Sequence, residues 1–275
     1  MIVVTGATGN VGRSLVERLV GGGQPVRAVS RRDAGRTALP PGAEVAHPGS
    51  AGLFEGAVKL FLHVRATGER TGTVLDEARA AGVRHVVMLS SGIIQEGADE
   101  THPIHRQHAR VEQLVRDSGL EWTFLRPNAF SANALQWAGQ IREGDTVRGP
   151  FAGAVTAPIH EDDIAAVAER SLLDTGHDGA VHRLTGPGAV TNSGQVEAIG
   201  RVLGRDLTYR EIPVEEAEAD FFPDMPRQVA RAVLESFATM VGSPPEITST
   251  VEEITGRPAR TFTEWVEDHE ADFAR

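Results

Sequence analysis

Ile2-Val3-Val4-Thr5 opens the chain, and Gly6-Ala7-Thr8-Gly9-Asn10-Val11-Gly12 follows at once. The first four residues predict a short buried strand, and residues 13–20 predict an amphipathic helix that ends at the glycines 21–23. Residues 25–30 predict a second strand. Strand, glycine turn, helix and strand together make a βαβ unit, in which the two strands lie parallel.

The same alternation continues along the chain. It predicts strands at residues 43–46, 57–64, 83–89 and 122–125, and helices at 73–81 and 102–117. Such a pattern is typical of an α/β fold with a doubly wound, Rossmann-like parallel sheet of about six or seven strands. We therefore expect residues 1–150 to form a dinucleotide-binding domain.

The second half is less regular and rich in proline and glycine. Helices are expected at residues 128–142, 162–173, 191–203, 226–241 and 262–273, with short strands at 155–159, 182–184 and 207–212. We expect residues 151–275 to form mainly a smaller C-terminal lobe that covers the substrate, with some segments returning to the core.

Composition excludes several classes of protein. The 275 residues contain no cysteine, so a disulfide framework, a zinc ribbon and a thiol nucleophile are excluded. No apolar run approaches the roughly 20 residues of a membrane helix, and we expect a cytoplasmic protein without membrane contact. The net charge of −11 disfavours nucleic-acid binding. Residues 1–36 nevertheless carry six arginines against two acids, which suits a polyphosphate ligand.

The glycine turn is the strongest functional signal. Its glycines allow the backbone to turn tightly and approach a phosphate, while the helix N-terminus offers N–H donors and partial positive charge. A turn without a ligand is the alternative, but the βαβ context favours a dinucleotide. The cofactor-binding residues predicted here are Gly6, Thr8, Gly9, Asn10, Val11 and Gly12.

Two arginines follow the second strand. NAD-binding proteins usually carry an acid there for the ribose hydroxyls, whereas Arg31 and Arg32 suit the 2′-phosphate of NADP. Solvated surface arginines are the alternative. The sequence thus favours NADP and leaves NAD open.

Further motifs extend over most of the chain. They are Leu89-Ser90-Ser91, His108 with Glu112 and the stretch 118–123, Leu125-Arg126-Pro127-Asn128-Ala129-Phe130, Ile159-His160-Glu161-Asp162-Asp163-Ile164-Ala165 and Leu184-Thr185-Gly186-Pro187. With the glycine turn, these motifs resemble the NmrA-like group of atypical short-chain dehydrogenases/reductases. The resemblance implies an NAD(P)-binding Rossmann fold and further cofactor contacts at His63, Ser90, Pro127 and Asn128.

The resemblance also suggests catalytic residues. Ser90 would bind the substrate carbonyl or the cofactor, and His108 or His105 would donate a proton to the reduced oxygen, since related bacterial quinone reductases carry a histidine at the position of His108. Solvated rings at a helix start are the alternative for both histidines. A metal site is disfavoured, because no carboxylate or cysteine completes a usual ligand set nearby.

The sequence departs from the family pattern in two places. Pro48-Gly49 stands where an acid commonly lies near the adenine. The single tyrosine, Tyr209, and the single lysine, Lys59, are far apart in sequence, so a Tyr/Lys reductase dyad is absent.

The function implied is an NAD(P)H-dependent oxidoreductase that reduces a quinone or an aromatic, polyketide-like ketone, also as part of an oxygenation or tailoring step. A non-catalytic NADP(H)-sensing regulator is the alternative. The expected partner is a small aromatic or quinone molecule, and a homodimer is left open.

Overall fold

The computed structural model describes residues 1–31, 39–95, 97–221 and 225–274, which form two compact units. Unit 1 consists of Met1–Pro127, Glu161–Leu184 and Thr250–Arg257. Unit 2 consists of Asn128–His160, Thr185–Ser249 and Pro258–Arg275. The chain thus first changes unit at Asn128, upstream of the boundary expected at residue 150, and segments from its second half return to unit 1.

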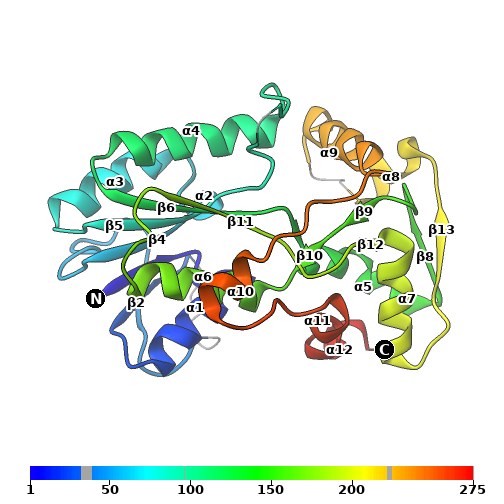
Figure 1. The fold of residues 1–275 in the computed structure, drawn as a ribbon, viewed down its shortest axis with the longest axis horizontal. Coiled ribbons are helices and arrows are strands. Elements are labelled where there is room, and N and C mark those ends of the chain that lie inside the picture. Colours follow the sequence, from blue (N-terminus) through cyan, green and yellow to red (C-terminus); the bar gives the residue numbers. More distant parts are fainter. Residues whose placement is uncertain (32–38, 96, 222–224, 275) are drawn as a thin grey trace. The chain divides into compact units, whose positions relative to one another are not determined.

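Unit 1 is built on a seven-stranded sheet in the order β11-β6-β5-β4-β1-β2-β3 (Figure 1). Every pairing in it is parallel, which confirms the predicted doubly wound architecture. The strands are β1 (Ile2–Thr5), β2 (Val26–Val29), β3 (Glu44–Ala46), β4 (Lys59–His63), β5 (His85–Leu89), β6 (Glu121–Pro127) and β11 (Ala180–Leu184).

Helices cover both faces of this sheet, so its central strands are apolar throughout. In Figure 1, α3 and α4 lie on one face and α1 and α6 on the other. The first face closes over a core that includes Leu75, Val115 and Met88. The helices of unit 1 are α1 (Asn10–Gly21), α2 (Val64–Thr67), the 3-10 helix η2 (Gly68–Arg70), α3 (Thr71–Ala80), α4 (Pro103–Asp117), α6 (Glu161–Leu173) and α10 (Thr250–Thr255).

Unit 2 combines three two-stranded sheets with helices. Its core gathers around Trp265, Phe273 and Ile141, which are fully buried. Its strands are β7 (Ala129–Phe130), β8 (Thr146–Gly149), β9 (Val155–Thr156), β10 (Pro158–Ile159), β12 (Val190–Thr191) and β13 (Thr208–Glu211). Its helices are η3 (Ser131–Trp137), α5 (Ala138–Glu143), α7 (Asn192–Leu203), α8 (Val214–Phe221), α9 (Arg227–Thr239), α11 (Phe262–Asp268) and α12 (Glu270–Phe273).

The single helix expected at residues 128–142 is wrong. Ala129 and Phe130 instead form β7, which pairs with Pro158 and Ile159 of β10, and a 3-10 helix follows before α5 begins. The backbone of residues 129–130 thus finds its partners in a segment 29 residues further along the chain, which a local helical pattern cannot reveal.

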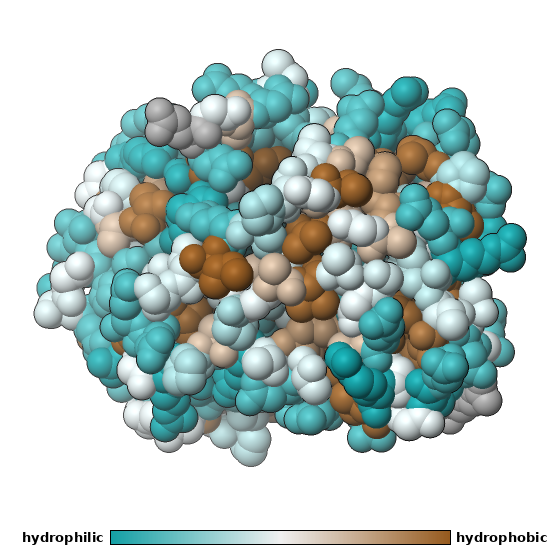
Figure 2. Space-filling view, turned by 45° about the vertical axis from the view of Figure 1, so that its right-hand side comes forward, coloured by the Kyte–Doolittle hydropathy of each residue, from teal (hydrophilic) through white to brown (hydrophobic). Residues whose placement is uncertain are grey.

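Within the described residues, no helix is long and apolar enough to cross a membrane. The face drawn in Figure 2 is largely hydrophilic, with hydrophobic side chains interrupted by polar ones.

Candidate functional site

The glycine turn between β1 and α1 serves both the fold and a ligand. At Gly12, a Cβ would lie 2.2 Å from the carbonyl oxygen of Gly6, so only glycine lets the helix pack this closely. At Gly9, the nearest atom to a Cβ would be that same oxygen at 3.4 Å, an ordinary contact. Gly12 is therefore required by the packing, whereas Gly9 leaves open space at the start of α1, where a ligand can approach.

A cavity of about 330 Å³ in unit 1 begins at this turn. It contains Thr5, Gly6, Thr8 and Gly9, and it extends past the ends of β2, β3 and β4. Three arginines and a histidine line it, whereas none of the described lining residues is acidic: Thr5, Gly6, Thr8, Gly9, Val29, Ser30, Arg31, Pro48, Gly49, Leu53, Phe54, His63, Arg65, Ala66, Thr67, Arg70 and Val74. Such a surplus of positive charge fits a polyphosphate ligand. Open space at Gly9, free helix N–H donors and this charge together fit a dinucleotide cofactor.

Arg31 and Arg32 were predicted to bind the 2′-phosphate of NADP. Arg31 is exposed and lines the cavity. Arg32 lies outside the described residues. Pro48 and Gly49 also line the cavity, so the stretch that departs from the family pattern is still part of its wall.

His63 lies at the end of β4 and lines the same cavity. Its Nδ1 accepts a hydrogen bond from the Arg65 backbone N–H at 3.2 Å, so the neutral ring carries its proton on Nε2. Burial, with the charges of Arg65 and His108 nearby, lowers the pKa of His63. The ring is therefore an uncharged donor at neutral pH.

His108 is held in the opposite tautomer. Its Nδ1 lies 2.9 Å from the carbonyl oxygen of Ile104, which can only accept, so Nδ1 carries the proton and Nε2 is free to accept one. Burial lowers the pKa of His108, although the bond to Ile104 and the charge of Glu112 oppose this. At neutral pH this imidazole is mostly uncharged and is a weak source of protons.

The other histidines of α4 differ from His108. His105 is buried, and its Nδ1 has no hydrogen-bond partner within the part of the chain that the structure describes. His102 precedes the helix as its N-cap and accepts from the Ile104 N–H at 3.2 Å.

Ser90 belongs to a buried charge network that the sequence did not predict. Its hydroxyl donates to Glu112 at 2.6 Å, so its proton is already engaged. Glu112 also accepts two hydrogen bonds from Arg126, at 2.8 and 2.6 Å, and one from Arg116 at 2.9 Å. Burial alone would raise the pKa of Glu112, but the bonds from Arg126 and Ser90 and the two positive charges outweigh it, and the pKa is lowered. Ser90 can still accept a hydrogen bond.

Pro127 and Asn128 stand at the end of β6. Pro127 is buried, and its carbonyl accepts from the Gly92 N–H at 2.8 Å. Asn128 is exposed and precedes β7, and Phe130 occupies the N-cap position of η3. Their assignment to cofactor binding stays a prediction.

Tyr209 and Lys59 are both engaged elsewhere. The Tyr209 hydroxyl donates to the Pro150 carbonyl at 2.8 Å, and burial raises the pKa of this phenol well above its usual value. The Lys59 ammonium donates to the Leu172 carbonyl. Neither side chain is a ready proton donor.

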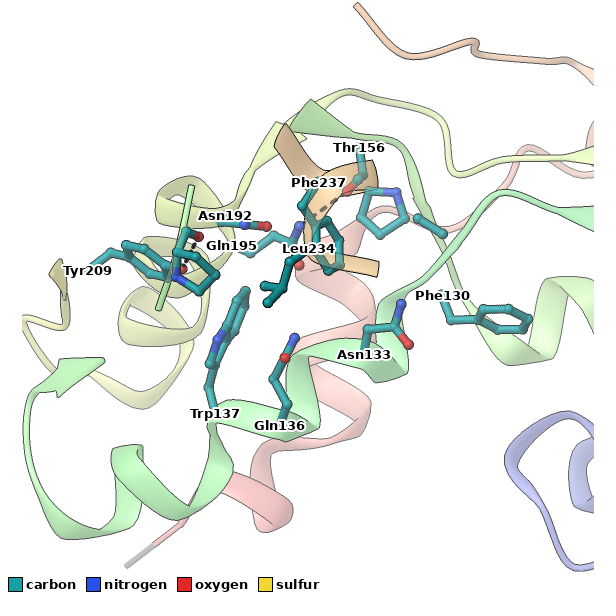
Figure 3. Close-up of a pocket in the computed structure, with 13 residues that line it drawn as sticks. Phe130, Asn133, Gln136, Trp137, Thr156, Asn192, Gln195, Tyr209, Leu234 and Phe237 are labelled. Atoms are coloured by element: carbon teal, nitrogen blue, oxygen red, sulfur yellow. Dashed lines mark hydrogen bonds between the residues drawn. The ribbon is translucent and has the colours of Figure 1, made fainter. Parts of the chain in front are cut away.

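Unit 2 contains a second, smaller cavity of about 50 Å³ (Figure 3). Trp137, Gln136 and Asn133 rise from η3 toward Leu234 and Phe237, as Figure 3 shows. None of its described lining residues is charged: Ala129, Phe130, Asn133, Gln136, Trp137, Pro150, Thr156, Pro158, Asn192, Gln195, Tyr209, Leu234 and Phe237. The amides of Asn133 and Gln136 make no hydrogen bond within the described residues, so they can bind an uncharged polar group.

Aromatic side chains contribute both to this cavity and to the hydrophobic cores. Phe130 and Trp137 line the cavity of unit 2, whereas Phe124 is core and Phe151 packs in a small cluster with Ile212. The side chain of Phe221 and all of Phe222 fall outside the described part of the structure.

Sequence reasoning missed Arg65 and Arg70, which complete the positive lining of the unit 1 cavity. Their spacing after the strand at 57–64 is the signal that could have indicated them, because residues just beyond a parallel strand lie at the ligand-binding edge.

Comparison with known proteins agrees with this geometry. A model of the NmrA-like family matches residues 1–264. A (4-alkanoyl-5-oxo-2,5-dihydrofuran-3-yl)methyl phosphate reductase from Streptomyces griseus is 40% identical, covering 100% of this chain and 99% of its own. An NAD(P)H azoreductase from Xenophilus azovorans is 32% identical over 99% of both chains.

Among solved structures, an NADPH-dependent quinone oxidoreductase from Escherichia coli in complex with NADPH is similar, with a TM-score of 0.80. It is 25% identical, and the match covers 98% of this chain and 100% of that one. Motifs, fold and relatives agree, and the chain belongs to the NmrA-like family.

Proposed function

We propose that this chain reduces a conjugated carbonyl compound, a quinone or an aromatic ketone, with hydride from NAD(P)H. It is an NAD(P)H-dependent oxidoreductase, as its relatives of 32 and 40% identity are named reductases. The acceptors in the relatives' names, a quinone, an azo compound and an unsaturated lactone, all have a conjugated π system.

The choice of acceptor rests on one observation: three candidate proton donors of the described chain, Tyr209, Lys59 and Ser90, already donate to other groups. Tyr209 and Lys59 are bound to backbone carbonyls, and Ser90 donates to Glu112. Hydride addition to an isolated ketone leaves a localised alkoxide that needs a proton donor in the transition state. A quinone or aromatic ketone spreads the negative charge over its π system, so it needs little help.

For such an acceptor, the residues of this chain need only bind the cofactor and help to place a proton on the reduced oxygen. The cofactor supplies the hydride when bound, and the residues that would hold it are those of the glycine turn with Arg31 and His63. The Nε2–H of His63 can donate a hydrogen bond to a developing oxyanion, while His108 can pass on a proton in its minor charged form. The balance is one hydride and one proton added to the acceptor, which gives a hydroquinone or an alcohol.

The cavity of unit 2 has an uncharged lining. Its volume of about 50 Å³ holds a few water-sized groups, and free amides can bind a carbonyl oxygen. The cavity can therefore hold a small uncharged group within unit 2.

The test compares acceptors that differ in their need for acid. NADPH oxidation is followed by absorbance with a quinone, an aromatic ketone and a saturated aliphatic ketone of similar size. We expect turnover of the first two and little of the third. Comparable turnover of the saturated ketone would show that a strong acid is present, and no turnover with any acceptor would reject the enzymatic proposal.

The same lack of an acid favours a second candidate, an NADP(H)-sensing regulator. A sensor should bind NADPH and NADP⁺ with different affinities and leave NADPH unconsumed in the presence of every acceptor. Calorimetric titration with both forms, beside the absorbance assay, separates the two functions.

A further inference from the structure

His47-Pro48-Gly49-Ser50 forms a tight turn at the wall of the unit 1 cavity. The Ser50 N–H donates to the His47 carbonyl at 3.1 Å, and Gly49 has a φ of +78°. Proline followed by a residue with positive φ is typical of a type II turn. The turn follows β3, which lies beside β2, and the Ser30 N–H bonds the Ala46 carbonyl at 3.0 Å. It is therefore a neighbour of Arg31.

The guanidinium of Arg70 lies against the bare Cα of Gly49. A Cβ at Gly49 would stand 2.7 Å from Nη1, 3.4 Å from Nη2 and 3.5 Å from Cζ of Arg70. Any larger residue at position 49, including the acid of the family pattern, would therefore displace the guanidinium. Arg70 therefore occupies space at this wall that the absence of a side chain at position 49 leaves open.

Among the residues that the structure describes, Arg70 has one ion-pair partner, Glu77, and this pair does not neutralise its charge. Glu77 lies 3.8 Å away, and the two side chains are 53% and 45% exposed. An ion pair this long and exposed contributes little. Arg70 also lines the cavity together with Arg31 and Arg65, without an acid among the described lining residues.

We propose that Arg70 acts with Arg31 to bind the 2′-phosphate of NADP(H), and that this pair makes the site selective for NADP(H) over NAD(H). The proposal rests on the nicotinamide cofactor of the proposed function, but not on the identity of the acceptor. A 2′-phosphate carries nearly two negative charges and three acceptor oxygens, which two guanidinium groups can share. The purine ring is the less suitable partner, because it carries no negative charge to pair with the two guanidinium groups.

The experiment uses ligands that lack nicotinamide. Binding of 2′,5′-ADP and 5′-AMP is measured by calorimetric titration for wild type and Arg70→Ala, and binding of NADPH and NADH by fluorescence. Loss of one charge-assisted contact should weaken the binding of 2′,5′-ADP and NADPH by about tenfold or more, while the affinities for 5′-AMP and NADH should change by less than about twofold.

A matched control removes the same charge elsewhere. Arg79 also belongs to the α3 region, pairs loosely with Asp76 at 3.9 Å and does not line the cavity. Arg79→Ala should leave all four affinities unchanged. Arg70→Lys keeps the positive charge but lacks the planar guanidinium that can bind a phosphate through two N–H groups. It should therefore retain part of the selectivity for NADP(H) over NAD(H). Circular dichroism and thermal unfolding should show that each variant is folded, because Arg70 and Arg79 are exposed.

If Arg70→Ala weakened the binding of 2′,5′-ADP and of 5′-AMP equally, Arg70 would contact the adenosine and the proposal would be overturned. Unchanged binding of both would also overturn it. Both results are independent of turnover: a protein that binds 2′,5′-ADP selectively but reduces no acceptor would reject the reductase function and leave the role of Arg70 standing.

Discussion

Glu112 is the residue whose replacement we expect to destabilise unit 1 most clearly. Its carboxylate is 1% exposed, and it accepts hydrogen bonds from Ser90, Arg126 and Arg116. Glu112→Gln keeps the shape and one acceptor oxygen but removes the negative charge. Glu112→Ala removes both and leaves Arg126, which is 14% exposed, without its counter-charge.

The expected magnitudes follow from these contacts. An uncompensated buried charge costs about 3–5 kcal/mol, so Glu112→Ala should lower the free energy of unfolding by about that amount. Glu112→Gln also leaves Arg126 without its counter-charge, but it keeps one acceptor oxygen for the guanidinium, so its cost should be smaller, about 1.5–3 kcal/mol. Urea unfolding at neutral pH, followed by circular dichroism, measures both.

Glu216→Gln is the matched control. Glu216 bonds Arg148 at 2.6 Å, but the two side chains are 53% and 45% exposed, so the pair should contribute less than about 1 kcal/mol. Equal destabilisation by Glu112→Gln and Glu216→Gln would refute the reasoning, because burial would then make no difference.

The pH dependence gives an independent check. The folded pKa of Glu112 is lowered, so its contribution to stability is present above the unfolded pKa and is lost as pH falls through the folded pKa. Wild type should therefore lose stability on acidification more than Glu112→Gln does. A constant difference between the two proteins across the acid range would contradict the lowered pKa.

Three further predictions concern residues of unit 1. Gly9→Val should fold normally and lose most NADPH affinity in a fluorescence titration, since its side chain enters the open space where the ligand would approach. Gly12→Val should instead unfold at lower temperature, because its side chain collides with Gly6. Retained NADPH affinity in Gly9→Val would exclude the turn as the cofactor site. Arg31→Ala should weaken the binding of NADPH about 10- to 100-fold and that of NADH far less. Equal losses of affinity would favour NAD as the cofactor. His108→Ala should lower kcat by about tenfold or more while leaving cofactor affinity unchanged, with His105→Ala as its control on the same helix. If the His108 imidazolium donates the proton, the kcat of the wild type should rise as pH falls toward the lowered pKa of His108. A pH-independent kcat would instead assign the proton to water.

The parallel sheet could be predicted because each of its signals is local. The apolar residues 2–5, the glycine turn and the helix behind it are contiguous, and the structure confirms β1, α1 and β2 within a few residues. The cavity at the ends of β1 and β2 follows from the same rule, since ligands bind at the carboxyl edge of parallel strands.

The rest of the site depends on contacts between distant residues. Glu112 was visible as part of a motif, but the sequence does not show that it meets Ser90, 22 residues away, and Arg126, 14 residues away. Arg70 reaches Gly49 only because one position in the turn lacks a side chain. The structure was needed to find both contacts.

These contacts also change how the histidines and Ser90 should be interpreted. Sequence alone made Ser90 a candidate for binding the substrate carbonyl or the cofactor, and His108 a candidate for donating a proton to the substrate oxygen. The structure gives each hydroxyl or ring proton a fixed acceptor: Glu112 for Ser90 and the Ile104 carbonyl for His108. Ser90 can therefore deliver its proton only by breaking that bond, and neutral His108 can deliver one only after its Nε2 has been protonated. A site built in this way favours acceptors that hold negative charge by themselves, and conjugated carbonyl compounds meet that requirement.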